Sequence, residues 1–210
     1  MWNTCWQCGG YRPDKRIDPQ GPTAICPECG HGHCFQQLPL LLVSGASGAG
    51  KSTVCHALMG RLTQVVLLDS DNLWQPEFNK PDDNYSAFFE TWLRMCKNIG
   101  QSGRPVVLFG AGVGVPSNLE SCIERRYFST LHYLALTVDD EVLIERLQQR
   151  PAWRQSGTEA YLAEHVQFNQ WFRSRSALES PAVELIDTTH IPPTTTVKQV
   201  AQWIRETMAA

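Results

Sequence analysis

The chain alternates between short runs of adjacent apolar residues and longer stretches in which apolar residues recur every three or four positions. The short runs predict buried strands, at 40–43, 65–68, 106–109, 132–138 and 182–186. The longer stretches predict helices, at about 53–62, 84–99, 117–127, 141–149, 158–175 and 195–208. Strands that alternate with helices are typical of a parallel sheet covered on both faces. The pattern therefore predicts an α/β fold, a three-layer αβα sandwich around a five-stranded parallel sheet.

Residues 1–37 lack this alternation and contain two C-x₂-C pairs, Cys5 with Cys8 and Cys26 with Cys29. Their separation of 17 residues suits a four-thiolate zinc site. The segment has too little apolar content to fold alone, so metal binding must supply folding free energy. We therefore expect a zinc ribbon at 1–37 and a second domain at 38–210. Because four thiolates leave no open coordination position, the zinc is expected to be structural.

Two alternatives accompany the zinc prediction. The four cysteines could be unligated thiols in a loop. His31, His33 and Cys34 also crowd the second pair and could compete as ligands, although four thiolates already complete a tetrahedron. We interpret these three residues as flanking the site.

A glycine-rich segment follows the first strand of the larger domain and precedes a predicted helix. It satisfies the G-x-x-x-x-G-K-[ST] phosphate-loop pattern, and its residues are Gly45, Ala46, Ser47, Gly48, Ala49, Gly50, Lys51, Ser52 and Thr53. Such a loop turns backbone N–H groups toward an anion, and the helix N-terminus adds partial positive charge. Lys51 is expected to reach the β- and γ-phosphates of a nucleoside triphosphate, and Ser52 to hold Mg²⁺. The alternative is a glycine-rich turn that binds nothing.

The second strand ends in two carboxylates, Asp69 and Asp71. Residues two apart on a strand share a face, so both can point into one cleft. We expect Asp71 to orient or deprotonate an acceptor hydroxyl, with Asp69 supporting it or a Mg²⁺-bound water. The third strand ends in the glycine-rich run 110–114, unlike the acidic ending found in GTPases and motor ATPases. The alternative for 69–72 is a polar turn that caps a helix.

Three segments resemble small-molecule and nucleotide kinases of the phosphate-loop class. Residues 68–72, Leu-Asp-Ser-Asp-Asn, are similar to the Leu-Asp-Gly-Asp-Asn of adenylylsulfate kinases and to the Gly-Asp of gluconate-type kinases. Residues 146–150, Arg-Leu-Gln-Gln-Arg, are similar to the arginine-bearing helix that leads into the lid of such kinases. Residues 186–189, Ile-Asp-Thr-Thr, resemble the loop that packs beside adenine, which implies nucleotide contacts for Thr188 and Thr189. The resemblance covers about 38–208 and excludes the ribbon.

Phosphoryl transfer needs cations that close over the migrating group. Arg146, Arg150 and Arg154 recur every four residues, and the last two lie in or beside a predicted lid near 150–158. We expect Arg150 and Arg154 to stabilise the transition state, with Arg146 as a further candidate. Surface arginines paired with Glu141 or Glu145 would give a similar pattern.

Composition narrows the class of protein and of partner. The formal net charge is −3, which does not favour nucleic acid as a partner. The aliphatic stretch 38–43 is far too short to cross a bilayer, and the N-terminus shows no secretory signal pattern. We therefore expect a cytoplasmic protein with no membrane partner, whose cysteines are thiols or metal ligands.

The sequence favours an ATP-dependent kinase that uses ATP, Mg²⁺ and a small-molecule, nucleoside or nucleotide acceptor. The acceptor is expected between 70–98 and 110–117, among the residues Trp74, Phe78, Tyr85, Phe88, Phe89 and Arg94. One alternative is a regulatory nucleotide-binding module whose ribbon contacts another protein. The other is a nucleic-acid 5′-hydroxyl kinase, favoured slightly by basic residues between the cysteine pairs. A homodimer is compatible with the sequence.

Overall fold

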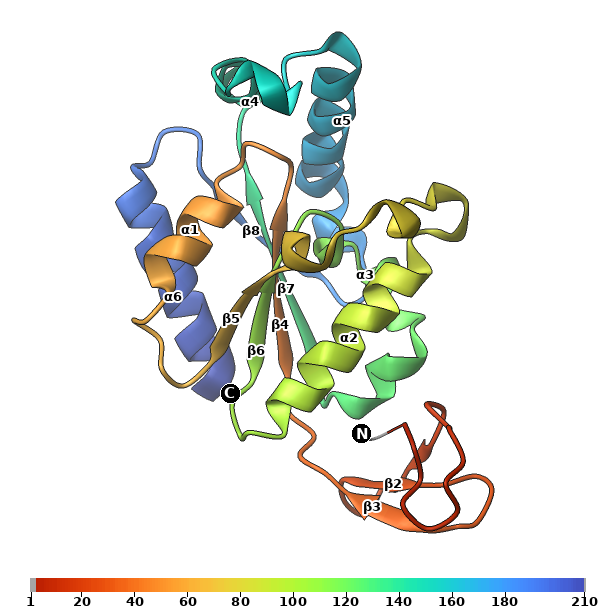
Figure 1. Cartoon of the computed structure of the whole chain (residues 1–210). Helices are drawn as coiled ribbons and strands as arrows, with labels where there is room; N and C mark the ends of the chain where they lie inside the picture. The colour runs from red at the N-terminus through yellow and green to blue at the C-terminus, as the bar shows by residue number, and fades with distance from the viewer. Residues whose placement is uncertain (1–2, 210) are drawn as a thin grey trace.

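Five parallel strands form the centre of the molecule in the computed structural model, which describes residues 3–209 (Figure 1). They are β4 (Leu40–Gly45), β5 (Val66–Asp69), β6 (Val106–Phe109), β7 (Leu131–Thr137) and β8 (Val183–Asp187). Their spatial order is β5-β6-β4-β7-β8, and every neighbouring pair is parallel. The predicted five-stranded parallel sheet is thus confirmed, and each strand lies within one or two residues of its predicted range.

Within residues 3–209, six α-helices accompany the sheet: α1 (Lys51–Leu58), α2 (Ser86–Gly100), α3 (Pro116–Glu120), α4 (Asp140–Gln148), α5 (Glu159–Arg175) and α6 (Pro193–Ala209). Figure 1 shows α1 and α6 on one side of the sheet and α2, α3 and α5 on the other. Alternate residues of β4 separate the two cores. Leu41 and Val43 pack with α1 and α6, whereas Leu40 and Leu42 pack with α2 and α5. The fold is the three-layer αβα sandwich of phosphate-loop proteins.

The first helix of this sandwich begins at Lys51, two residues earlier than predicted, because the phosphate loop itself makes the turn into it. Gly50 takes a φ of 107° just before α1, a conformation that a residue with a Cβ rarely adopts. The helix ends at Leu58, and Gly60 follows with a φ of 73°. The predicted end at residue 62 is therefore too late by one helical turn.

The helix predicted at 117–127 is divided into α3 and a 3-10 turn, Ile123–Tyr127. The reason is a tertiary contact that sequence periodicity does not reveal. The carboxylate of Glu90, in α2, accepts hydrogen bonds from the backbone N–H groups of Ile123 (2.5 Å) and Glu124 (3.2 Å). This carboxylate caps a new turn, so the chain bends at Cys122, whose ψ of 143° is extended.

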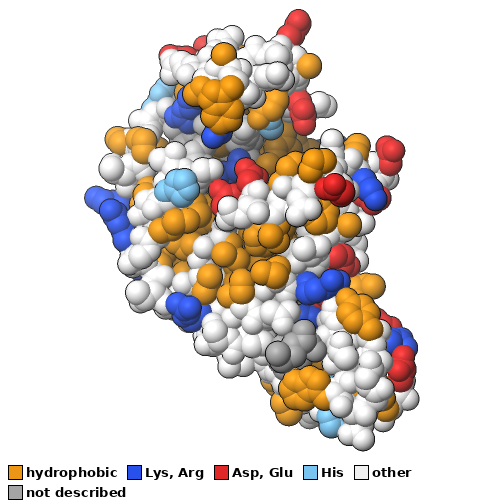
Figure 2. All heavy atoms as spheres, viewed as in Figure 1, with side chains coloured by type: hydrophobic (Ala, Val, Ile, Leu, Met, Phe, Trp, Pro, Cys, Tyr) orange, Lys and Arg blue, Asp and Glu red, His pale blue; other side chains and the backbone are white. Residues whose placement is uncertain are grey.

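A smaller antiparallel sheet precedes β4 and consists of β1 (Arg16–Ile17), β2 (Thr23–Ile25) and β3 (Gly32–Cys34). We call residues 3–37 the ribbon; residues 1 and 2 of the predicted zinc ribbon lie outside the described residues. Figure 2 shows it as a separate lobe, and Figure 1 places it at the end of the sheet away from α4. Ala24 and Phe35 of the ribbon pack against Tyr127 of the larger unit.

Buried polar side chains join the ribbon to the sandwich. Lys97 of α2 donates to Glu124 (2.6 Å) and to Asn3 of the ribbon (2.7 Å), and Asn3 also donates to Glu124 (2.7 Å). All three side chains are almost completely buried. A buried carboxylate is stable only when it is paired and hydrogen-bonded, so Asn3 and Lys97 together keep Glu124 in place. Within residues 3–209, no helix is both long and apolar enough to cross a membrane.

Candidate active site

A wide cleft lies at the carboxyl ends of the strands, where open parallel sheets bind ligands. Its volume is about 720 Å³. The phosphate loop, the end of β5, the end of β6 and the segment from α4 to α5 all contribute to its walls. The lining residues are Ser47, Gly48, Gly50, Lys51, Ser52, Thr53, Asp69, Asp71, Trp74, Phe109, Gly110, Ala111, Arg146, Arg150, Arg154, Tyr161 and His165.

Lys51 lies at the centre of this cleft, on the first turn of α1. Its ammonium donates to the carbonyl oxygens of Gly45 (2.7 Å) and Ala46 (3.0 Å) in its own loop. Burial lowers the pKa of Lys51 to about 8, Arg150 acts in the same direction, and Asp71 and Asp69 oppose the shift. Gly45 is required in this conformation, because its φ is 138° and a Cβ there would collide with the carbonyl oxygen of Leu136.

Three oxygen-bearing side chains converge beside Lys51. The Ser52 hydroxyl donates to Asp69 (3.4 Å), and the other carboxylate oxygen of Asp69 accepts the backbone N–H of Asp71 (3.0 Å). This second contact caps the 3-10 turn Ser70–Leu73 that carries Asp71. Desolvation in the cleft raises the pKa of Asp71, Asp69 adds to the effect, and Lys51 and Arg154 oppose it. Asp69 and Asp71 thus share one cleft with the phosphate loop.

A hydrogen bond from helix α2 fixes the turn that carries Asp71. The indole N–H of Trp92 donates to the carbonyl oxygen of Ser70 (3.1 Å), and Trp92 is almost completely buried. Residue 110, at the end of β6, must be glycine, because a Cβ there would overlap the Ser70 side chain. Tight packing of this kind limits how far Asp71 can move.

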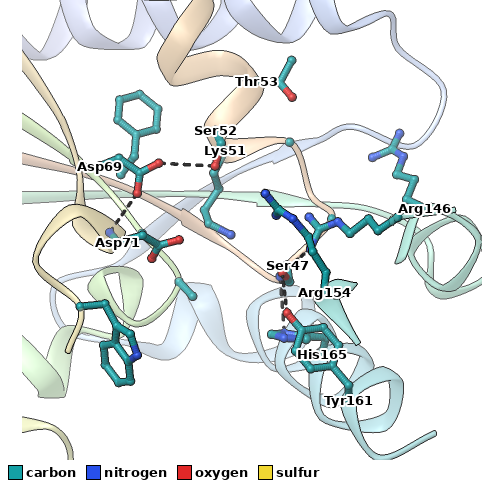
Figure 3. Close-up of a pocket in the computed structure, with 17 residues that line it drawn as sticks. Ser47, Lys51, Ser52, Thr53, Asp69, Asp71, Arg146, Arg154, Tyr161 and His165 are labelled. Atoms are coloured by element: carbon teal, nitrogen blue, oxygen red, sulfur yellow. Dashed lines mark hydrogen bonds between the residues drawn. The ribbon is translucent and has the colours of Figure 1, made fainter. Parts of the chain in front are cut away.

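The other wall of the cleft fixes Ser47 of the phosphate loop. Arg150 and Tyr161 each place a donor 3.0 Å from the Ser47 hydroxyl oxygen, and the Ser47 N–H lies 3.4 Å from Nδ1 of His165 (Figure 3). Burial lowers the pKa of His165 to about 4, and Lys51 and Arg150 lower it further. His165 is therefore neutral near pH 7, and its unprotonated Nδ1 can accept this hydrogen bond.

Tyr161 and His165 were not predicted as site residues from the sequence. They lie four residues apart on α5, which places them on one helix face, and their rings meet at 4.2 Å between centroids. The available signal was this spacing of two polar aromatic side chains shortly after the arginines. It is weak, because α5 carries polar residues on most of its surface and only Asn169 and Phe172 are buried.

The three predicted arginines all line the cleft, but they have different partners. Arg146 lies to one side and donates to the carbonyl and hydroxyl oxygens of Thr188 (3.0 and 3.3 Å). Figure 3 shows Arg146 apart from Arg154, whose guanidinium lies closer to Lys51. Arg154 is the last residue of a 3-10 turn, Ala152–Arg154, and its guanidinium lies over the ring of the exposed Trp153 at 5.1 Å. Of the three arginines, Arg150 makes a direct hydrogen bond to the phosphate loop, at Ser47 (3.0 Å).

A second, smaller pocket of about 190 Å³ adjoins the cleft behind the loop and shares Arg146 with it. Thr188, Ile191 and Pro193 line this pocket together with Ala49 and Val54. Thr188 is buried and hydrogen-bonded to the carbonyl oxygen of Thr137 (3.0 Å).

Thr189, the other residue that the resemblance implicated, does not line this pocket. Its hydroxyl is engaged by Asp187 (2.5 Å) and accepts the N–H of Asp139 (2.9 Å).

The residues predicted around an acceptor are divided among three places: the cleft, the buried core and the region near the ribbon. Trp74 lines the cleft, where it contacts Phe88 and Tyr85 with ring centroids 5.2 and 6.1 Å apart. Phe88 belongs to the buried core. Arg94 lies elsewhere, because its guanidinium pairs with Glu124 (3.1 Å) near the ribbon. The expectation that Arg94 lies among the acceptor residues is wrong: its helix face points to the ribbon.

The four predicted zinc ligands come together at the tip of the ribbon. The sulfurs of Cys5, Cys8, Cys26 and Cys29 all lie within 4.8 Å of one another. Two of the separations are 3.6 Å (Cys5 to Cys29) and 3.9 Å (Cys8 to Cys26). Tetrahedral zinc with Zn–S bonds of about 2.3 Å separates its sulfurs by about 3.8 Å, so the geometry fits this ion.

Side chains around the cluster match their predicted flanking role. The buried His33 lies with Nε2 3.4 Å from the Cys5 sulfur and outside the four-sulfur group. Cys34 is exposed.

Solved structures with the same fold include several kinases. A sugar kinase from Janibacter sp. HTCC2649 is 17% identical, with a TM-score of 0.61 over 81% of this chain and 95% of that one. The tunicamycin resistance protein of Deinococcus radiodurans is 16% identical, with a TM-score of 0.57 over 80% and 96%. A gluconokinase from Sinorhizobium meliloti 1021 is 18% identical, with a TM-score of 0.53 over 78% and 90%. At these identities the similarity shows a shared fold.

Sequence comparison assigns the family. No curated protein sequence matches the chain. The profile of one family, described as an AAA domain, matches residues 40–174, from the first strand of the large sheet to the end of α5. This range includes the phosphate loop, both aspartates and all three arginines, and it covers more than half of the 210 residues. The chain therefore belongs to this AAA domain family of phosphate-loop proteins.

Proposed function

We propose that this protein is an ATP-dependent phosphotransferase that transfers the γ-phosphate of ATP to a hydroxyl group of a small molecule. The observation that carries the proposal is the composition of one cleft of about 720 Å³, which joins a phosphate loop to two carboxylates and three arginines. A regulatory module needs only the phosphate loop. The carboxylates and arginines on opposite walls are the additional groups that phosphoryl transfer uses.

The nucleotide is expected to enter with its phosphates on the loop and its base in the adjoining pocket. Backbone N–H groups at the start of α1, together with Lys51, suit the β- and γ-phosphates. The apolar side chains of Ile191 and Pro193 suit a base. Arg146, held by Thr188 between the two pockets, suits a nucleotide contact better than a contact with the migrating phosphoryl group.

The residues beside Lys51 fit Mg²⁺. Mg²⁺ prefers oxygen ligands, often one or two carboxylates with phosphates and water, and the Ser52 hydroxyl and Asp69 carboxylate supply oxygens 3.4 Å apart. We propose that Ser52 holds the ion directly and that Asp69 holds it directly or through water. When bound, the ion neutralises charge on the nucleotide phosphates.

In the proposed reaction, the acceptor oxygen bonds to the γ-phosphorus while the bond from that phosphorus to the bridging oxygen breaks, releasing ADP. The hydroxyl proton passes to the carboxylate of Asp71. Its raised pKa makes Asp71 a stronger base than an exposed aspartate. Arg150 and Arg154 stabilise the charge on the migrating group, and the segment near 150–158 acts as a lid that brings them over it.

For the ribbon we propose one structural zinc ion held by Cys5, Cys8, Cys26 and Cys29. Its support is the sulfur geometry, which suits tetrahedral zinc, and a chain too polar to fold by burial alone. The ribbon lies at the far end of the sheet from the cleft, so the zinc takes no part in transfer.

The proposed activity is tested by measuring ADP release from ATP and Mg²⁺ in the presence of pooled hydroxyl compounds. Asp71→Asn should lower turnover about a hundredfold or more while ATP affinity stays nearly unchanged, because the shape of the side chain is kept. Asp18→Asn is the matched control, since Asp18 lies in the ribbon and its carboxylate accepts the N–H of Gln20, two residues away (2.9 Å). Equal turnover in Asp71→Asn and wild type removes Asp71 from the mechanism. ATP binding without transfer to any acceptor supports the regulatory module instead.

A further inference from the structure

The cleft has two ends, and only one is available to an acceptor if the proposed function holds. The end beside Arg146 continues into the pocket of Thr188 and Ile191, where the nucleotide base is expected. The other end is formed by β5, β6 and the turns that follow them, with Asp71, Trp74 and Ala111 in its wall. We call this the acceptor end.

No basic side chain of the described residues lines the acceptor end. The cations of the cleft are Lys51 on the phosphate loop and Arg146, Arg150 and Arg154 on the opposite wall. Lys51, Arg146 and Arg150 belong to the side that is expected to bind the triphosphate. Arg154 also acts on Asp71 and is expected to bear on the migrating phosphoryl group. A carboxylate or phosphate group on the acceptor would therefore have no counter-ion of its own and would meet Asp69 and Asp71 instead.

The other basic residues in this part of the sequence cannot supply one. Arg94 and Lys97 point away and pair with Glu124 at the ribbon. Arg104 precedes β6 and lies at the opposite end of the strands, beside Thr63. Lys80 is exposed on the loop that runs from residue 70 to residue 85 and does not line the cleft.

That loop strengthens the negative field at the acceptor end. The loop contains one basic residue, Lys80, and four acidic residues, Asp71, Glu77, Asp82 and Asp83. Asp82 and Asp83 are exposed, and Figure 2 shows red acidic side chains in the middle of this face and at its rim, with blue basic side chains beside them. Such a field attracts cations and repels anions.

Trp74 adds a surface that recognises cations. Its side chain is 46% exposed although it lines the cleft, and its edge contact with Phe88 leaves part of the indole uncovered. The turn that carries Asp71 also positions Trp74, because the backbone N–H of Trp74 donates to the carbonyl oxygen of Asp71 (3.1 Å). An indole close to carboxylates is a favourable environment for an ammonium group.

We propose that the acceptor is a hydroxyl compound that carries a protonated amine and no carboxylate or phosphate, such as an amino sugar or an amino alcohol. The hydroxyl faces Asp71 and the γ-phosphate, while the ammonium lies against Trp74 in the field of the carboxylates. This proposal excludes nucleotides, sugar acids and sugar phosphates as acceptors.

The test compares three sets of acceptors of similar size, in which one substituent is an ammonium, a neutral hydroxyl or a carboxylate. D-glucosamine, D-glucose and D-glucuronate form one set, and ethanolamine, ethylene glycol and glycolate form another; larger amino sugars with their deaminated and oxidised forms extend the comparison. With ATP and Mg²⁺, kcat/KM should be highest for the amine in each set that reacts, by about tenfold or more over the neutral compound. Preference for the acids, or equal use of amine and neutral compound, overturns the proposal and leaves the phosphotransferase intact. Absence of transfer to every compound, with ATP still bound, removes the phosphotransferase and this proposal together.

A variant provides the second readout. Trp74→Leu should raise KM for the amine acceptor by about three- to thirtyfold, the range expected for loss of a cation–π contact, with little change in KM for ATP. Trp74→Phe should restore part of the affinity. Trp6→Leu is the matched control, because Trp6 is 65% exposed in the ribbon and the same substitution there should leave both KM values unchanged. An unaltered KM for the amine in folded Trp74→Leu protein contradicts the role of the indole.

Discussion

Lys51 is a lysine that must be charged to bind phosphates and yet is buried, and burial disfavours the charge. Burial in the cleft lowers its pKa to about 8. A bound triphosphate favours the ammonium and should raise that pKa toward the ordinary value of about 10.4. Nucleotide binding is therefore linked to proton uptake in the range between these two values.

This linkage predicts that ATP binds more weakly as the pH rises above 8. Below pH 8 the free protein already carries the ammonium, so affinity is nearly constant; above it, binding must first protonate Lys51. Between pH 7 and pH 9 the Kd should rise about tenfold, since each pKa unit corresponds to a factor of ten. The second phosphate ionisation, near pH 6, lies outside this window. Calorimetry in buffers of different ionisation enthalpy should detect the proton uptake.

Lys51→Ala is the control for the pH effect. Its affinity should be lower than that of the wild type at pH 7 and should show no further fall between pH 7 and pH 9. A wild-type Kd that is the same at both values contradicts the lowered pKa.

At the residue scale, the sequence predicted the groups that belong to continuous motifs. The phosphate loop, Asp69 and Asp71 lie within 27 positions of one another, and the topology of parallel strands brings them to one edge. Tyr161 and His165 lie more than a hundred positions after Ser47. Their contact with it depends on the path of α5 over the sheet, which local spacing does not encode.

At the scale of elements, strands were easier to predict than helix ends. A continuous apolar run such as Val106–Phe109 must be buried on both sides, which fits a strand in a sheet that is covered on both faces. The break after α3 instead depends on Glu90, a residue in another helix that caps the turn at Ile123. Tertiary contacts of this kind override local helix preference.

The buried contact between α2 and the turn after α3 yields a prediction about stability. Glu124→Gln removes the negative partner of Lys97, whose side chain is only 1% exposed, and leaves an uncompensated buried ammonium. Loss of one partner of a buried ion pair costs about 3–5 kcal/mol. Urea unfolding should show this decrease in the free energy of unfolding.

Two further variants separate the charge effect from general damage. Lys97→Met combined with Glu124→Gln should recover part of the loss, because no buried charge then remains in the pair. Glu206→Gln, on the exposed face of α6, should change stability by less than about 1 kcal/mol. Equal stability of Glu124→Gln and wild type contradicts the structural role of the pair.

At the scale of the whole molecule, the change in pattern near residue 37 indicated two differently stabilised parts. The sandwich has apolar cores on both faces of its sheet, whereas the ribbon has one small apolar cluster with Ala24 and Phe35. The cysteine spacing predicted the four-sulfur group. The buried junction through Asn3 and Lys97 was not predictable, because neither residue belongs to a motif.

This arrangement predicts that zinc supports the ribbon without controlling nucleotide binding. Purified protein should contain about one zinc per chain by elemental analysis. Removing it with a chelator, or by Cys26→Ser, should unfold the ribbon and lower the melting temperature, because the ribbon loses its metal and α2 loses its buried partner Asn3.

The Kd for ATP should change by less than about threefold, a free-energy change below about 0.7 kcal/mol, since the phosphate loop lies at the opposite end of the sheet. Cys34→Ser, at an exposed cysteine outside the four-sulfur group, should retain zinc and stability. Protein without zinc contradicts the metal site, and loss of ATP binding in parallel with zinc contradicts the independence of the two ends.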